Sequence, residues 1–187
     1  MHPYKTIVGY SEREVVNYIE SDLQIETNQQ TYKALIKYRN NNIFLNINID
    51  LGGGFESGSE TTSLLCYLKM NSNFNFTIRS QILLDKILLF FGKQNVITGY
   101  EEFDNNVIIK TNDEYKLLDI FEEPEIRSTL QSFKSGFILK LTKDKISKNK
   151  KQYSLEWIID KGILDGRSLQ KIYHVFVNLL NSLNNEY

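Results

Sequence analysis

Cysteine and proline are nearly absent from this chain of 187 residues, which has one cysteine and two prolines. Because Cys66 stands alone, the chain can form no internal disulfide and no metal cluster that needs several thiolates. Cys66 alternates with Leu64 and Leu68, a spacing that places all three side chains on the buried face of a strand. We interpret Cys66 as a core residue, because a catalytic thiolate needs a partly exposed, electropositive setting.

The sequence also lacks an excess of charge, a long apolar run and a secretory signal. Its 22 basic and 23 acidic residues leave a formal net charge of -1, which gives no general attraction to nucleic acid or acidic membranes. The most apolar stretch, residues 82–91, carries Asp85 and Lys86 and is too short to span a bilayer. The N-terminus has neither the basic start nor the apolar run of a signal peptide. These features predict a soluble, cytoplasmic protein.

Histidine and glycine form no pattern that marks a metal or phosphate site. His2 lies near the terminus, and His174 has no cysteine or carboxylate at metal-ligand spacing on its predicted helix. The glycines at 52–54 are followed by Phe55-Glu56, where a phosphate-binding loop would have a lysine and a helix. We therefore expect a surface histidine, a mobile interstrand loop, no metal and no cofactor.

Acidic residues gather at two places in the sequence. The first cluster is Glu101, Glu102 and Asp104, and the second is Glu122, Glu123 and Glu125. Paired carboxylates can perform acid–base catalysis or bind a divalent cation, but neither cluster has the pattern of a calcium loop. Carboxylates at the start of a helix also interact favourably with its dipole. We interpret both clusters as solvated helix ends. Since no motif combines a nucleophile, a base and a stabilising group, we predict that the protein is not an enzyme.

The sequence does contain ample material for a core, with 41% hydrophobic and 12% aromatic residues. Apolar residues alternate over residues 32–51 on both sides of an asparagine-rich segment at 39–42, which predicts a β-hairpin. A second pair of strands is predicted over residues 61–79, with a turn at 71–73. Two further strands are predicted at residues 137–141 and 153–159.

The stretch from Glu102 to Phe133 has the most sharply defined pattern. Val107 to Ile109 is a β-branched run typical of a strand that is buried on both faces. Thr111 stands three residues before Glu114, the spacing of a capping box, and so predicts the start of a helix. Pro124 is expected to end this helix and begin another, because proline fits the first turn of a helix but not its interior.

Three more helices complete the predicted elements. A capping box of Ser11 and Glu14 predicts one over residues 11–23, Ser80 is expected to cap one over residues 80–91, and the last covers about 168–183. The element order favours a single α+β domain over residues 1–187. We expect an antiparallel sheet of two strand meanders backed by amphipathic helices, with a long C-terminal helix. The halves at about 1–92 and 93–187 could be related by duplication.

The order of several motifs resembles a soluble domain of uncharacterised bacterial proteins. These motifs are Ile97-Thr98-Gly99, Glu102-Phe103-Asp104, the strand Val107 to Ile109, Thr111-Asn112-Asp113 and Pro124-Glu125-Ile126-Arg127. The strand pair around Asn41 and the glycine-rich loop that follows it are also similar, so the resemblance covers most of the chain. In those relatives the domain often follows paired membrane helices, which are not seen in this sequence. The resemblance implies a shared fold and no particular activity.

We expect a non-catalytic binding or regulatory module that contacts other proteins, such as an immunity protein or an accessory subunit. One candidate contact surface is a lysine-rich segment consisting of Lys143, Lys145, Lys148, Lys150 and Lys151. The segment lacks the stacking aromatic residues and the groove-reading helix of nucleic-acid surfaces, so the expected partner is a protein. The solvated tip of a hairpin is the simpler interpretation of the same lysines.

The alternative function is that of a carrier for a small apolar ligand. A curved antiparallel sheet packed on an aromatic-rich helix can enclose a cavity between the two. The residues that we expect to line such a cavity are Phe76, Phe137, Trp157, Tyr173 and Phe176.

Overall fold

The chain forms eight strands and a set of helices. The computed structural model describes residues 4–25, 31–52, 57–70, 72–81, 96–133, 136–147 and 150–184. The first part of the chain supplies β1 (Lys5–Gly9), α1 (Glu12–Ile25), β2 (Thr31–Tyr38), β3 (Asn41–Asp50) and β4 (Ser59–Leu68). The second part supplies β5 (Phe76–Ser80), α3 (Glu101–Asp104), β6 (Val107–Thr111), α4 (Glu114–Phe121), α5 (Pro124–Gln131), β7 (Phe137–Ser147), β8 (Lys150–Ile159) and α6 (Gly166–Asn184). The helix predicted over residues 80–91 lies outside the described residues beyond position 81.

All eight strands belong to one sheet, in the order β1-β2-β3-β4-β8-β7-β5-β6. β1 and β2 are parallel, and the other neighbouring pairs are antiparallel. The predicted α+β class, the largely antiparallel sheet and the C-terminal helix are therefore confirmed. The β2–β3 hairpin is confirmed as well, although its turn is shorter than predicted. Only Arg39 and Asn40 form the turn, with Arg39 at a φ of 50°, and Asn41 already belongs to β3.

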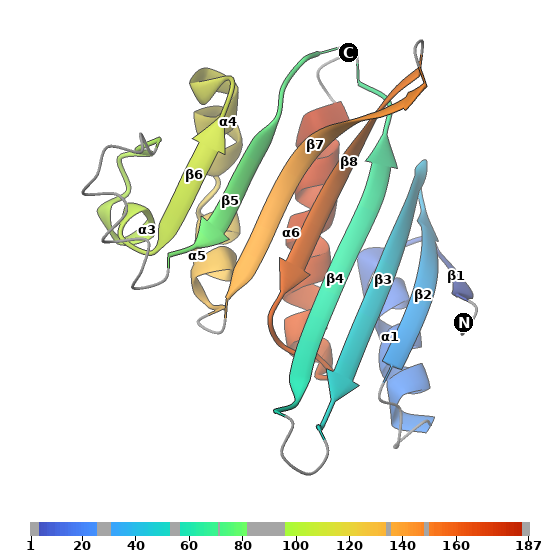
Figure 1. Ribbon diagram of the computed structural model, residues 1–187. Helices are drawn as coiled ribbons and strands as arrows, with labels where there is room; N and C mark the ends of the chain where they lie inside the picture. The colour runs from blue at the N-terminus through green and yellow to red at the C-terminus, as the bar shows by residue number, and fades with distance from the viewer. Residues whose placement is uncertain are drawn as a thin grey trace.

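The prediction that the strands over residues 61–79 pair with each other is wrong. β4 pairs with β3 and β8, whereas β5 pairs with β6 and β7. The β7–β8 hairpin lies between β4 and β5 and takes up the hydrogen-bonding edge of each (Figure 1). The sheet is thus one mixed sheet and not two meanders. Alternation within a strand sets which face of the strand is buried but leaves its neighbour undetermined.

The capping box predicted at Thr111 and Glu114 is also wrong. Asp113 caps α4, because its Oδ1 accepts a hydrogen bond of 3.2 Å from the backbone N–H of Lys116. Thr111 instead donates its hydroxyl proton to the carbonyl oxygen of Asn75 at 2.8 Å. The threonine therefore ties the end of β6 to the residue before β5.

Three other local predictions are confirmed. At the start of α1, the backbone N–H of Glu14 donates to Ser11 Oγ at 3.2 Å, and the Glu14 carboxylate accepts from the N–H of Tyr10 at 2.8 Å. Pro124 occupies the first turn of α5, directly after the end of α4. The strand Val107 to Ile109 is buried along its whole length, as its β-branched sequence indicates.

The helices pack on one face of the sheet. Figure 1 shows α1, α6, α4 and α5 behind the strands, with α6 behind the centre and α4 and α5 behind the β5–β6 edge. The apolar residues at helical spacing along α6 are buried, namely Leu169, Ile172, Tyr173, Phe176, Leu180 and Leu183. None of the helices in the described ranges has the combination of length and apolar character that a membrane span requires.

A buried threonine fixes the turn between β8 and α6. Thr62 of β4 is fully buried, and its hydroxyl donates to the carbonyl oxygen of Lys161 at 2.7 Å. The same hydroxyl oxygen accepts from the backbone N–H of Ile163 at 2.9 Å. Two backbone groups of the turn are thus satisfied by one side chain of the neighbouring strand, and the direction in which α6 leaves the sheet is set by β4.

Replacing Thr62 by valine is expected to lower the free energy of unfolding by about 1–3 kcal/mol, because it leaves the N–H of the buried Ile163 and the carbonyl of Lys161 without their partner. Urea unfolding of the purified protein measures this change. The matched control is Thr61→Val on the same strand, which lies half-exposed on the opposite face and should change stability by less than about 0.5 kcal/mol. Equal losses from the two replacements would contradict the role given to Thr62.

Candidate functional site

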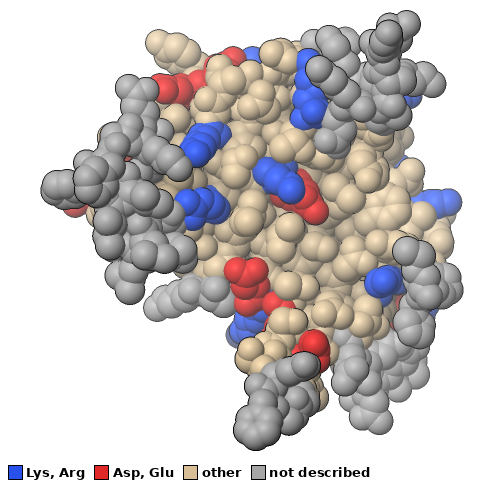
Figure 2. Space-filling view, in the orientation of Figure 1, with Lys and Arg blue, Asp and Glu red and all other residues tan. Residues whose placement is uncertain are grey.

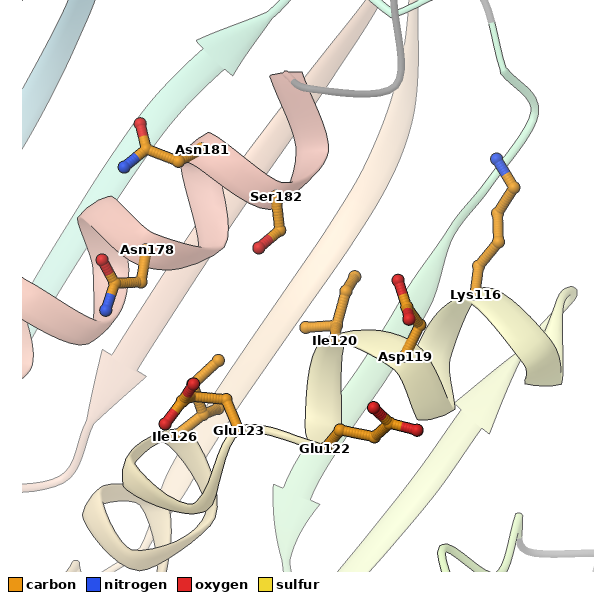
Figure 3. Close-up of a pocket in the computed structure, with 9 residues that line it drawn as sticks. All are labelled: Lys116, Asp119, Ile120, Glu122, Glu123, Ile126, Asn178, Asn181 and Ser182. Carbon is orange, nitrogen blue, oxygen red and sulfur yellow. The ribbon is translucent and has the colours of Figure 1, made fainter.

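A groove of about 740 Å³ lies on the helical side of the molecule, between α4, α5 and α6. Asn178, Asn181 and Ser182 of α6 form one wall. The other side is formed by α4, α5 and their junction, through Lys116, Asp119, Ile120, Glu122, Glu123 and Ile126. Figure 3 shows the α6 side chains across from the others, with Ser182 and Ile120 pointing into the space between the helices.

The junction between α4 and α5 places the acidic residues of this groove. Proline in the first turn of α5 forces the chain to leave α4, so that Glu122 follows the last residue of α4 and Glu123 precedes α5. Arg127 holds the junction together, because its guanidinium donates to the carbonyl oxygen of Phe121 and stacks on the ring of Tyr100 at 3.4 Å. The two glutamates are therefore carried by a fixed turn.

The lining of the groove combines negative charge with uncharged hydrogen-bonding groups. The carboxylates of Asp119, Glu122 and Glu123 are exposed, and among the described residues they form no ion pair. The one cation of the lining, Lys116, places its ammonium group 5.9 Å from the ring centre of Phe74. The groove can therefore attract a cation and offer it amide and hydroxyl partners from α6.

A histidine cluster adjoins the groove at Asn178. His174 Nδ1 lies 2.6 Å from a carboxylate oxygen of Glu12 on α1, and its Nε2 lies 3.4 Å from Glu125 on α5. The side-chain amide of Asn178 is 3.0 Å from the same Nε2. The hydrogen bond to Glu12 raises the pKa of His174, partial burial opposes this shift, and the negative charges of Glu12 and Glu125 add to it. In its charged form His174 bridges three helices.

The sequence predicted a surface histidine, but His174 is partly buried and lies against carboxylates of two other helices. Glu12 and Glu125 come from α1 and α5, which lie far from His174 along the chain. Their approach depends on the packing of three helices, and no spacing in the sequence reports it. Among the described residues, no group of histidine, cysteine and acidic side chains has an arrangement that could hold a metal ion.

The lysine-rich segment predicted as a contact surface forms the outer end of the β7–β8 hairpin, away from the groove (Figure 1). Lys145 faces Lys151 across the two strands. The ammonium of Lys143 donates to Asn73 Oδ1 at 2.5 Å and lies 5.5 Å from the ring centre of Tyr153. Lys148 lies outside the described residues, as do the side chains of Lys145, Lys150 and Lys151. Binding through this segment stays a prediction.

The residues predicted to line an apolar cavity are all buried, namely Phe76, Phe137, Trp157, Tyr173 and Phe176. They do not line the groove. Trp157 Nε1 and the Tyr173 hydroxyl are buried and have no hydrogen-bond partner among the described residues. Burial raises the pKa of the Tyr173 hydroxyl, which keeps it protonated.

Two other candidate residues, Cys66 and Asp104, have roles in the structure and lie outside the groove. Cys66 is buried as predicted, and burial raises the pKa of its thiol to about 12, while a hydrogen bond from the backbone of Asn42 opposes the shift. Asp104 accepts hydrogen bonds from Thr98 and from the N–H of Gly99, which orders the turn before α3. Neither residue contributes to the groove.

The chain matches no protein-family model, and comparison with curated proteins and with solved structures finds no significant similarity. The resemblance to a bacterial domain therefore stays a prediction.

The contribution of His174 to stability should decrease as the pH rises. Because its pKa is higher in the folded protein than in the unfolded chain, the contribution is complete below about pH 6.5 and is lost as the pH passes through the folded-state value. Thermal unfolding from pH 5.5 to 9 should show the largest difference between the natural protein and His174→Gln at the acidic end. His2→Gln is the matched control and should show no such trend. A difference that is constant over this range would contradict the charged bridge.

Proposed function

We propose that this protein is a non-catalytic binding module that receives a cationic segment of a partner protein in the groove between α4, α5 and α6. The observation that carries the proposal is the lining of the groove, which combines the exposed carboxylates of Asp119, Glu122 and Glu123 with amide and hydroxyl groups of α6. An immunity protein or an accessory subunit is the kind of role that fits such a module. Its helices would present an amphipathic surface, with the polar side in the groove.

The spacing of the carboxylates favours an extended cationic segment over a single ion. Asp119 lies in the last turn of α4, Glu122 follows that helix and Glu123 precedes α5, so the groove carries three separate carboxylates. Several separate charges match several lysine or arginine side chains, which bind carboxylates by charge-assisted hydrogen bonds. Ile120 and Ile126 can contact the methylene groups of the same side chains.

The amide side chains of the α6 wall add specificity to this charge attraction. Asn178, Asn181 and Ser182 can accept hydrogen bonds from a guanidinium group or from the backbone of a bound segment. Because the carboxylates are exposed, their attraction is expected to be screened by salt. The groove should therefore hold its partner by several modest contacts that depend on ionic strength.

Reversing the groove charge is expected to remove the partner. In affinity capture from the source cells with quantitative mass spectrometry, the double replacement Asp119→Lys with Glu123→Lys should reduce recovery of a specific protein at least tenfold, and added salt should reduce recovery with the natural chain. The matched control is Glu101→Lys with Glu102→Lys, which reverses two exposed charges on α3. The protein recovered should carry a lysine- or arginine-rich segment that binds as a synthetic peptide. The same set of proteins recovered with all three chains would contradict the proposal.

A second candidate function, the apolar-ligand carrier, is supported by the unpartnered Trp157 Nε1 and Tyr173 hydroxyl. A buried polar group without a hydrogen bond costs about 1–3 kcal/mol, and a bound molecule with an acceptor could offset this cost.

Native mass spectrometry of protein purified from its source should then show retained mass, and Tyr173→Phe should reduce retention because it removes the hydroxyl. If the natural chain carries no ligand, and Tyr173→Phe leaves its stability unchanged or raises it, the interior is simply packed. That result would exclude the carrier.

A further inference from the structure

The face of the sheet opposite the helices is not covered by any helix in the described part of the chain (Figure 1). Along β2 the buried residues alternate with Lys33, Leu35 and Lys37, which point to this open face. Residues of the same open face continue across the sheet in register, as Leu35, Phe44, Leu65, Glu156, Lys140, Thr77 and Lys110. The open face is thus a continuous surface of side chains from strands distant in the sequence.

Apolar and aromatic side chains occupy one part of the open face. Tyr4 and Tyr67 both contact Phe44, with ring centres 5.3 and 6.1 Å apart and planes at 81° and 75°. Tyr4 is 41% exposed, Tyr67 48% and Val8 on β1 55%. Leu35 and Leu65 are half-buried beside Phe44. Such a grouping of partly exposed apolar residues is typical of an interaction surface.

The charge of the open face is positive. Lys140 forms an ion pair of 2.6 Å with Glu156 at the centre of the sheet. Lys33, Lys37 and Lys110 form no ion pair within the described part of the chain. Figure 2 shows this face as a broad tan surface with separate blue groups, a blue group beside a red one near its centre, and further red groups at its lower end and upper left. Lys33 and Lys37 lie on β2 beside the apolar area, and Lys110 lies on β6 at the far edge of the sheet, so the lysines do not form one basic patch.

The open face is large enough for a specific complex. Ile108 is buried on the open side of β6, so β5 and β6 are not counted. The six neighbouring strands from β1 to β7 in sheet order, about 4.8 Å apart, span roughly 24 Å, and at about nine residues each they extend roughly 30 Å, which gives roughly 700 Å². A stable protein–protein interface buries about 800 Å² on each partner.

The chemistry of the open face selects an acidic protein among the candidate occupants. The lysines stand separately and do not form the continuous positively charged groove that single-stranded nucleic acid follows. The rings of Tyr4, Phe44 and Tyr67 pack edge to face in one apolar group. Leucine side chains around them would gain from burial against apolar groups and not against a phosphate backbone. A second copy of the chain would bring the unpaired lysines of two identical faces together, which is unfavourable.

We propose that the open face of the sheet is a second interface, which binds a protein surface with an apolar centre and acidic residues around it. Lys33, Lys37 and Lys110 would contact the acidic residues, and Phe44 and Tyr67 would contact the apolar centre. This interface is separate from the groove, so the two surfaces can be tested independently.

The test uses photo-crosslinking of the full chain in its source cells. Benzoylphenylalanine in place of Tyr67 should crosslink to one protein, at a segment rich in aspartate and glutamate, and the same probe in place of Tyr115, which is 89% exposed on α4, should not. The identified protein is then produced and its affinity measured. Lys33→Glu with Lys37→Glu should weaken binding at least tenfold, as should Phe44→Ser, whereas Lys171→Glu on the exposed side of α6 should have no effect.

Circular dichroism and thermal unfolding confirm that each variant is folded. Among the described residues Lys33 and Lys37 make no ion pair, so reversing their charge is expected to leave the fold intact even if Phe44→Ser does not. The proposal would be overturned if the probe at Tyr67 crosslinked only to nucleic acid or only to other copies of this chain, or if the probes at Tyr67 and Tyr115 crosslinked equally. An unchanged affinity of the variant with Lys33→Glu and Lys37→Glu would also overturn it. Loss of binding by Asp119→Lys with Glu123→Lys alone would assign the partner to the groove instead.

Discussion

The pairing of β4 with β8 is the constraint on which the rest of the structure depends. These strands come from opposite parts of the sequence, and their register, from Thr62 with Ile159 to Leu68 with Tyr153, joins both parts into one sheet. The pairing brings the β7–β8 hairpin between β4 and β5. It also brings the turn after β8 to Thr62, whose buried hydroxyl binds that turn and directs α6 along the sheet. The pairing of β4 with β8 therefore both joins the two parts of the sheet and positions α6.

The two candidate binding surfaces follow from this arrangement. α6 continues from β8 at the centre of the sheet, whereas α4 and α5 continue from β6 at its edge, so the groove forms where these helices meet on the same face. The opposite face remains open within the described part of the chain. The groove presents Asp119, Glu122 and Glu123, and the open face presents Lys33, Lys37 and Lys110, which form no ion pair with other described residues. The net charge of -1 does not indicate these two surfaces, because acidic residues of one and lysines of the other cancel in the total charge of the chain.

Local features could be predicted from the sequence, and long-range ones could not. The β2–β3 hairpin, the box at Ser11 and the turn at Pro124 were predictable because the residues that determine them lie within a few positions of each other. The cap at Thr111 failed because a nearby aspartate competed for the same role and the threonine found a partner on Asn75. The partners of β4 and β5, the bridge from His174 to Glu12 and the groove all require tertiary packing. Periodicity reports which side of an element is buried and not what covers it.

The account rests on the separation of β4 from β5 by the β7–β8 hairpin, which creates both the groove and the continuous open face. Nuclear Overhauser effects between backbone protons test this topology most directly, because they detect neighbouring strands. The account predicts cross-strand signals between Leu65 and Glu156 and between Lys140 and Thr77, with none between β4 and β5. Signals that pair β4 directly with β5 would contradict it, and the positions of both proposed binding surfaces would then have to be abandoned.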